Sequence, residues 1–250
     1  MSQLIYHTGT LMAKGSAANA TPQAFGTLQN VSIDLSWTTK ELYGQYNFAV
    51  AVGQGNCKIT GKAASANIQA RLFNDIFFNG TLSQGETAVS VREAGTVPGA
   101  STYTVTVANS ATFVDEWEVL NATTGQPFIK VASAPAAGQY SVAAGVFTFA
   151  AADANAQVLI SYAYTVSASG QKLSLSQQLV GQAPIFSLLL AGGYTASGAT
   201  LPGIKLYACT GTKLSLATKQ NDFAIPNFEF MAFADVAGRV MDWSTNDKAS

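Results

Sequence analysis

Hydrophobic and polar residues alternate along much of the chain, and this alternation is typical of half-buried β-strands. Residues 31–38 alternate Val, Ile, Leu and Trp with Ser, Asp, Ser and Thr. Because successive side chains of a strand point to opposite faces, this run predicts a strand with one face against a core. Residues 48–52 and 58–62 continue the strand pattern. The polar, aromatic-containing connection at 39–47 is longer than a tight hairpin needs, and long loops inside compact domains are often functional.

One segment, from Ser65 to Phe78, has the apolar spacing of an amphipathic helix. Ser65 is a candidate N-cap, and Asn79 followed by Gly80 is a candidate C-terminal stop. The apolar stripe predicts that the helix packs against a sheet, with its aromatic residues in the core. The residues expected in this helix core are Ile68, Leu72, Phe73, Ile76 and Phe77.

The middle of the chain has a different sequence pattern, with short apolar runs separated by turns that contain Gly, Asn or Pro. These runs lie at 103–107, 113–120, 128–131, 139–142, 146–149 and 158–164. Short strands at this spacing predict a small β-sandwich or meander. We therefore expect residues 88–168 to form a module inserted into a main domain made of residues 1–87 and 169–250.

Strand patterns resume after the inserted module. They lie at 185–190, 204–209, 214–217, 227–234 and 239–243, with a hairpin turn expected at 235–238. Phe228, Phe230 and Phe233 occupy both faces of one run, which predicts a central strand or one covered by an interface. The tail at 246–250 is expected to be loose.

The amino-acid composition indicates that other subunits cover part of the protein surface. Of 250 residues, 48% are hydrophobic and only 11% are charged, well below the usual quarter. So few charges solvate a surface weakly, so we expect other subunits to cover much of it; a low-charge monomer is the alternative. The net charge is −1 and no Lys/Arg cluster occurs. This argues against gripping a nucleic-acid backbone but not against a neutral channel through which DNA slides.

The chain lacks a basic start followed by an apolar run, so no signal peptide is expected. No run of consecutive apolar residues is as long as a membrane-spanning helix, so no membrane anchor is expected either. Cys57 and Cys209 are expected to be buried thiols in a reducing compartment rather than a disulfide.

Candidate catalytic chemistry is sparse. The single histidine, His7, has no nucleophile motif around it, and no metal-ligand spacing occurs. The Gly55–Lys62 segment has the wrong spacing for a phosphate loop and the pattern of a strand. Asp115, Glu116 and Glu118 form the densest acidic group, and we interpret them as a solvated strand edge rather than a cation site or an acid/base pair. We therefore expect no catalytic, cofactor or metal site, and no enzyme activity.

The sequence at 41–46, 58–63 and 72–78 (ELYGQY, KITGKA and LFNDIFF) resembles the N-terminal part of the tail tube proteins, or major tail proteins, of tailed bacteriophages. The sequence at 214–219, 222–230 and 233–235 (LSLATK, DFAIPNFEF and FAD) is similar to the other half of that family pattern. The resemblance covers residues 1–87 and 169–250, whereas residues 88–168 depart from it and resemble β modules of phage structural proteins.

The resemblance implies a mainly β fold, a β-sandwich or barrel flanked by one α-helix. It implies hexameric rings that share an inner β-barrel and stack into a tube, with other tail proteins as partners and DNA passing through the lumen without specific binding. The location implied is the virion, after assembly in the host cytoplasm. An edge strand that pairs with a neighbouring copy buries its open hydrogen-bonding groups, and head-to-tail contacts make rings and filaments.

By the same resemblance, the loop at 39–47 reaches toward an adjacent ring. Its candidate contact residues are Lys40, Glu41, Leu42, Tyr43, Gln45 and Tyr46. Tyr43 and Tyr46 are the candidate anchors, because buried aromatic side chains carry much interface energy. Local packing within one hairpin is the alternative role for these two residues.

Three other functions stay open. The first is a different virion protein such as a capsid decoration protein, which coats heads and forms no tubes. The second is a carbohydrate-binding β-sandwich that exposes Trp37, Trp117 or Trp243 on a flat face. The third is an enzyme whose activity depends on Glu116 or Glu118.

Overall fold

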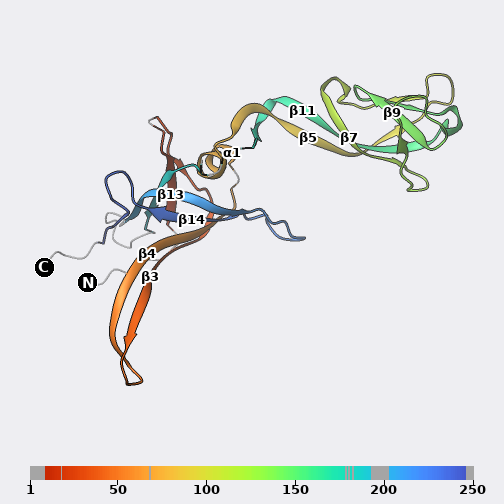
Figure 1. Cartoon of the computed structure of the whole chain (residues 1–250). Coiled ribbons are helices and arrows are strands. Elements are labelled where there is room, and N and C mark those ends of the chain that lie inside the picture. The colour runs from red at the N-terminus through yellow and green to blue at the C-terminus, as the bar shows by residue number, and fades with distance from the viewer. Residues whose placement is uncertain are drawn as a thin grey trace. The chain divides into compact units, whose positions relative to one another are not determined.

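The computed structural model describes residues 9–17, 19–67, 69–177, 179, 181, 183–192 and 203–245. The chain folds as two compact units, one made of Met1–Thr81 and Leu173–Ser250 and the other of Leu82–Lys172. These boundaries lie a few residues outside the 88 and 168 expected from the sequence. The protein is mainly β, with 58% strand and 7% helix, and its sheets are largely antiparallel (Figure 1). The expected fold class, a β-sandwich protein with one helix, is confirmed.

The first unit is built on one eight-stranded sheet. Its elements are β1 (Thr10–Gly15), β2 (Gln23–Ala24), β3 (Leu28–Tyr43), β4 (Ala49–Ser65), α1 (Ala70–Phe73), the π-helical η1 (Asn74–Phe78), β12 (Phe186–Ala191), β13 (Gly203–Ser215), β14 (Asn227–Phe233) and β15 (Met241–Trp243). The strand order is β2-β1-β12-β13-β14-β4-β3, and β15 pairs with β13. Because β14 lies between β13 and β4, the prediction of a central strand at 227–234 is confirmed.

The core of this unit lies between the sheet and the helix. Phe228 and Phe230 of β14 are fully buried, together with Leu72 and Ile76 of the helical segment. Aromatic rings contribute to this core, where Phe25 stacks on Phe228 with ring centroids 4.7 Å apart, and each such side chain contributes about 1.5–3 kcal/mol when fully buried. Of the predicted helix-core residues, Leu72, Phe73 and Ile76 are buried and Phe77 packs against this core, whereas Ile68 lies outside the described residues.

The start of the helix differs from the prediction. Ser65 is the last residue of β4, not an N-cap, and its buried hydroxyl donates a hydrogen bond to the Gly26 carbonyl at 2.7 Å. The helix begins only at Ala70, because pairing with β3 and β14 keeps the chain extended as far as Ser65. Its end is as predicted: Asn79 adopts the left-handed conformation, with φ of 46°, directly after η1.

The second unit contains two sheets. Its elements are β5 (Thr81–Thr96), β6 (Thr104–Thr106), the 3-10 helix η2 (Ser110–Thr112), β7 (Phe113–Asn121), β8 (Ile129–Lys130), β9 (Gln139–Ala143), β10 (Val146–Phe149), the 3-10 helix η3 (Ala151–Asp153) and β11 (Gln157–Ser174). The orders are β5-β11-β7 and β6-β10-β9-β8, and β8 pairs parallel with β9. Side chains from both sheets share one core that includes Phe147, Val158 and Tyr162.

Three expectations about strand extent are corrected. The segment 39–47 is not one long loop, because β3 continues to Tyr43 and β4 begins at Ala49. The runs at 204–209 and 214–217 belong to a single strand, β13, since β12 and β14 pair with successive parts of it. The strands β1, β2 and β5 were not predicted. The structure has a turn at 235–238, with the Gly238 amide donating to the Asp235 carbonyl, but the expected hairpin is wrong, because β14 pairs with β13 and β4 whereas β15 pairs with β13.

Candidate interaction surface on the β3–β4 arm

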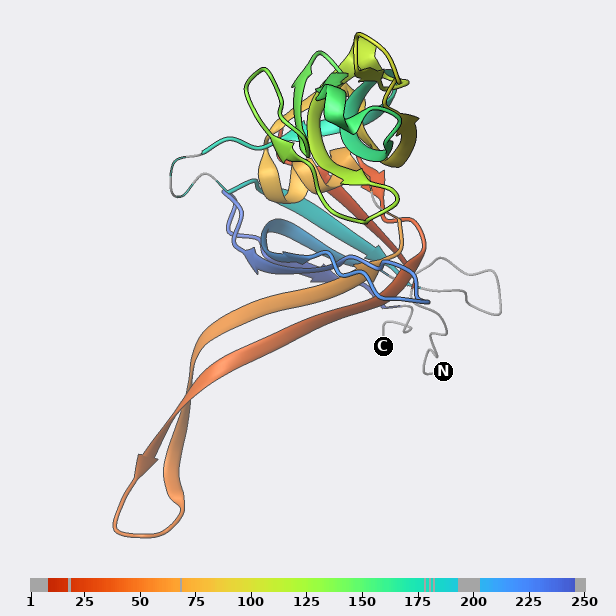
Figure 2. The same ribbon diagram turned by 90° about the vertical axis from the view of Figure 1, so that its right-hand side faces the viewer.

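The hairpin of β3 and β4 is longer than the sheet that holds it. β14 pairs with β4 only between Ile59 and Ala64, whereas β3 and β4 stay paired out to Tyr43 and Ala49. Residues 36–58 therefore form a two-stranded ribbon without a third strand, and we call them the arm. Figure 2 shows this ribbon leaving the sheet of its own unit.

The local sequence explains why the ribbon forms. Alternating and β-branched residues favour strands on both sides of the turn, and the turn itself carries Gly44 and polar residues. A register shift between Trp37 and Thr39 sets two β4 residues, Gly55 and Asn56, against Thr38. Such a bulge bends a hairpin. An added Cβ at Gly55 would lie 2.5 Å from the Thr38 hydroxyl oxygen, so a larger residue at the bulge would require the Thr38 side chain to move.

The arm exposes large apolar side chains that water solvates poorly. They are Trp37, Leu42, Tyr43, Tyr46, Phe48, Val50 and Val52. Phe48 is 85% exposed and Tyr46 is 72% exposed. Exposed apolar patches of this kind on a soluble protein mark interaction sites.

The backbone of the arm is open as well. β3 is the last strand in the sheet order, so its outer edge has no strand partner within the described part of the chain. The outer edge of β4 is equally open beyond Ile59 among the described residues. Natural edge strands are usually blunted by charge, but Lys40, Glu41 and Lys58 are the only charged residues of the arm. The edges are thus suited to pairing with another chain.

The structure brings the sequence-derived contact residues together on this arm. Lys40, Glu41, Leu42, Tyr43, Gln45 and Tyr46 are all exposed, four of them in β3 and two in the turn. The Tyr43 hydroxyl donates to the Glu41 carboxylate, and this hydrogen bond raises the pKa of Tyr43. Because both tyrosine rings are largely exposed, packing within the hairpin does not cover them.

The apolar residues Phe48, Val50 and Val52 also lie on this arm, although their strand pattern indicates burial. The half-buried strand expected at 31–38 is buried only in part: of its apolar residues, Val31 and Ile33 pack against the core, while Trp37 is already exposed. The expectation that Cys57 is buried is wrong for the same reason, since it lies beyond the last contact with β14; Cys209 is buried as expected.

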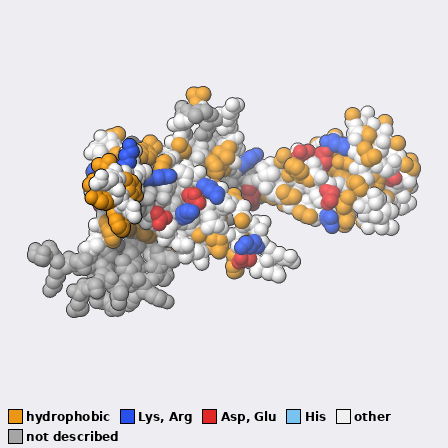
Figure 3. Space-filling view, turned by 60° about the horizontal axis from the view of Figure 1, so that its bottom comes forward, with side chains coloured by type: hydrophobic (Ala, Val, Ile, Leu, Met, Phe, Trp, Pro, Cys, Tyr) orange, Lys and Arg blue, Asp and Glu red, His pale blue; other side chains and the backbone are white. Residues whose placement is uncertain are grey.

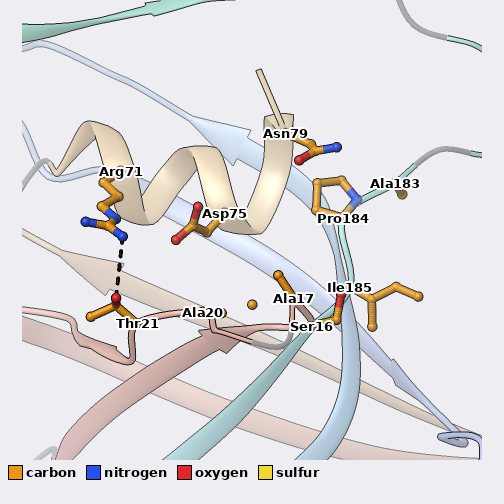
Figure 4. Close-up of a pocket in the computed structure, with 11 residues that line it drawn as sticks. Ser16, Ala17, Ala20, Thr21, Arg71, Asp75, Asn79, Ala183, Pro184 and Ile185 are labelled. Atoms are coloured by element: carbon orange, nitrogen blue, oxygen red, sulfur yellow. Dashed lines mark hydrogen bonds between the residues drawn. The ribbon is translucent and has the colours of Figure 1, made fainter. Parts of the chain in front are cut away.

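Figure 4 shows a cleft of the first unit. It has a volume of about 350 Å³ and is lined by charged side chains of the helical segment and by loop residues. Arg71 donates to the Thr21 hydroxyl at 3.4 Å, and Gln23 donates to the Asp75 carboxylate at 3.2 Å. Both charged groups of the cleft therefore have hydrogen-bond partners within the first unit.

The acidic group in the second unit is split between different partners. Glu116 pairs with Lys130, and Glu118 pairs with Arg92 at 3.4 Å. Both glutamates lie on β7, an edge strand of its sheet, but the Glu116 side chain is only 8% exposed, so the expected solvated edge does not include it. Among the described residues no group of three or more His, Cys, Asp or Glu side chains has the arrangement of a metal site. His7 lies outside the described residues.

The Gly55–Lys62 segment lies inside β4, as its pattern predicted, and not at a strand-to-helix turn. Within the described ranges, no helix combines the length and apolar character of a membrane span.

A scan of the chain against models of known protein families finds no match, and a search of curated proteins finds none either.

Proposed function

We propose that this chain is the structural subunit of a bacteriophage tail tube, and that it is not an enzyme. The observation that carries the proposal is the arm, whose exposed apolar side chains and open strand edges are left uncovered by a single copy. Only 11% of the residues of the chain are charged, and this low fraction is consistent with extensive coverage of its surface by neighbouring copies.

The proposed assembly follows from the kind of contact that an arm makes. In our proposal the arm of one copy binds a different surface of the next copy, so the contact is heterologous, and heterologous contacts generate rings or filaments rather than closed dimers. In our proposal six copies close a ring, the strands of neighbours join around a lumen, and rings stack into a tube. Other tail proteins cap this tube in the virion, and the near-neutral chain lets DNA pass without holding its phosphates.

The proposal is tested by imaging and by measuring association of the purified full-length chain. Negative-stain electron microscopy is expected to show rings with a central hole, and tubes at higher concentration or with other virion components. Coating of phage heads without tubes would instead support a capsid decoration protein. A chain that stays monomeric under all these conditions would refute assembly altogether.

The role of the arm is tested by Phe48→Ser, with Val236→Ser as the control. Val236 is also fully exposed but lies in the turn after β14, outside the arm. Burying a Phe side chain contributes about 1.5–3 kcal/mol, so Phe48→Ser is expected to weaken association about 10- to 100-fold per contact. Analytical ultracentrifugation measures this change. Equal association of both variants would exclude the arm as the interface even if tubes form.

A further inference from the structure

The second unit contains a ring of hydrogen bonds that crosses all three strands of its β5-β11-β7 sheet. The backbone N–H of Arg92 on β5 donates to the Ser161 hydroxyl oxygen on β11 at 3.0 Å. That hydroxyl donates to the Glu118 carboxylate on β7 at 3.3 Å, and the Arg92 guanidinium donates to the same carboxylate oxygen at 3.4 Å. Ser161 is only 6% exposed, so the ring combines a buried serine with an exposed ion pair between Arg92 and Glu118.

Arg92 is held in an unfavourable backbone conformation inside this ring. Its φ is 55°, in the left-handed region that a residue with a side chain rarely adopts. Such a conformation costs about 1–3 kcal/mol and persists where surrounding structure imposes it, which is frequent at ligand sites. Here it interrupts the regular course of a sixteen-residue strand and directs a guanidinium toward β7.

Trp117 precedes Glu118 of this ion pair in the sequence and lies on a bulge of β7. Glu118 pairs with Ser161 and Glu116 pairs with Tyr162, so Trp117 between them has no partner in the register of β7 and β11. Its side chain is 71% exposed, although a Trp is among the most costly residues to leave in water. Bulges next to functional sites commonly redirect a side chain, and this bulge carries an exposed indole at the residue before Glu118, the carboxylate partner of Arg92.

Glu116 and Glu118, the residues on either side of Trp117 in the sequence, are each paired with a basic side chain. Arg92 pairs with Glu118 and Lys130 pairs with Glu116. In Figure 3 acidic and basic side chains lie close together on this unit, rather than in a patch of one sign. A polyanion such as nucleic acid therefore gains little here. Charges and bulges on the edge strand β7 also disfavour addition of a strand from another protein.

We propose that this face of the second unit binds a neutral, hexose-based carbohydrate. A pyranose ring has one apolar C–H face, which matches an exposed indole, and a rim of hydroxyl groups, which matches a preorganised guanidinium and carboxylate. Trp117 stacks on the ring, Arg92 donates to hydroxyl oxygens and Glu118 accepts from hydroxyl groups. Ser161 is a positioning residue that holds Arg92 in place. The inference concerns a single chain and does not depend on assembly into a tube.

The test uses the full-length chain on a printed array of oligosaccharides built from glucose, galactose, mannose and N-acetylglucosamine, with sialylated and sulfated glycans on the same array. The wild-type chain is expected to bind neutral glycans, and isothermal titration with the best soluble hit then gives the affinity. Trp117→Ala is expected to lower this affinity about 10-fold or more, whereas Trp117→Phe, which keeps an aromatic face, retains most of it.

Trp243→Ala is the matched control, because Trp243 is 70% exposed and belongs to the other unit. It is expected to bind like the wild-type chain. Absence of any glycan binding, binding confined to acidic glycans, or equal loss in Trp117→Ala and Trp243→Ala would each overturn the proposal. Unchanged binding by Trp117→Ala with the wild-type thermal transition would overturn it too. Rings or tubes that lack glycan binding refute this inference alone and leave the proposed function intact.

Discussion

Two glycines of β4 provide a direct test of how the strand divides into a core part and an arm. Gly61 pairs with Phe230 of β14, and an added Cβ at Gly61 would lie 2.2 Å from the Cζ atom of the buried Phe230 ring. Gly53, in the arm of the same strand, would place its Cβ no closer than 3.9 Å to any neighbour, the Lys40 carbonyl oxygen. The same substitution, Gly to Ala, therefore meets a packed core at one site and open solvent at the other.

The expected magnitude follows from this geometry. The Phe230 ring is 1% exposed and sits in a close-packed core, so it cannot withdraw without displacing its neighbours. Overpacking of this kind costs about 1–3 kcal/mol. Both substitutions also restrict the unfolded chain, which stabilises by about 0.4–1 kcal/mol. Because this gain is common to both, the stability difference between Gly61→Ala and Gly53→Ala isolates a steric cost of about 1–3 kcal/mol.

Urea unfolding of the unassembled chain measures the difference in a Cys57→Ser background. Exposure of the buried Cys209 thiol then reports on the first unit alone. Gly53→Ala is expected to unfold at the same or a slightly higher urea concentration than the parent, and Gly61→Ala at a lower one, with an unchanged slope. Equal midpoints for the two variants, or a lower midpoint for Gly53→Ala, would refute the packing described for β4.

Two further outcomes concern titratable groups of the first unit. Burial raises the pKa of Cys209 to about 12, so at mildly alkaline pH iodoacetamide should alkylate only Cys57 in the unassembled native chain, and rapid modification of both thiols, detected by mass spectrometry, would contradict this. Hydrogen bonds from the Arg239 backbone and guanidinium lower the pKa of Asp235, so its stabilisation is present above the usual carboxyl range and is lost as the pH falls through the lowered pKa. Asp235→Asn should therefore be less stable than the parent at neutral pH, with the gap closing in acid; a gap that does not depend on pH would contradict this prediction.

The candidate interaction surface was only partly accessible from the sequence. The segment 39–47 stood out because it was polar, aromatic and too long for a tight turn, and its residues do lie on the arm. Phe48, Val50 and Val52 did not stand out, since apolar residues in a strand pattern are usually buried. Whether they are buried depends on a third strand, and β14 ends its pairing with β4 at Ile59.

Features that depend on neighbours within a few residues could be predicted before the fold was known. The alternation of apolar residues determined most strands, the apolar stripe located the helix, and Asn79 and the 235–238 turn were placed by local backbone preferences. These signals are short-ranged, because side-chain direction and turn geometry follow from the backbone of a few consecutive residues.

The length of each strand and the exposure of its side chains depend instead on contacts between distant segments. Ser65 could equally well cap a helix or end a strand, and hydrogen bonding to the Gly26 carbonyl decided for the strand. Trp117 has an ordinary strand sequence around it, and only its register against β11 places it on an exposed bulge. Burial and register depend on which distant segments pair, and the pattern within any one segment does not encode that pairing.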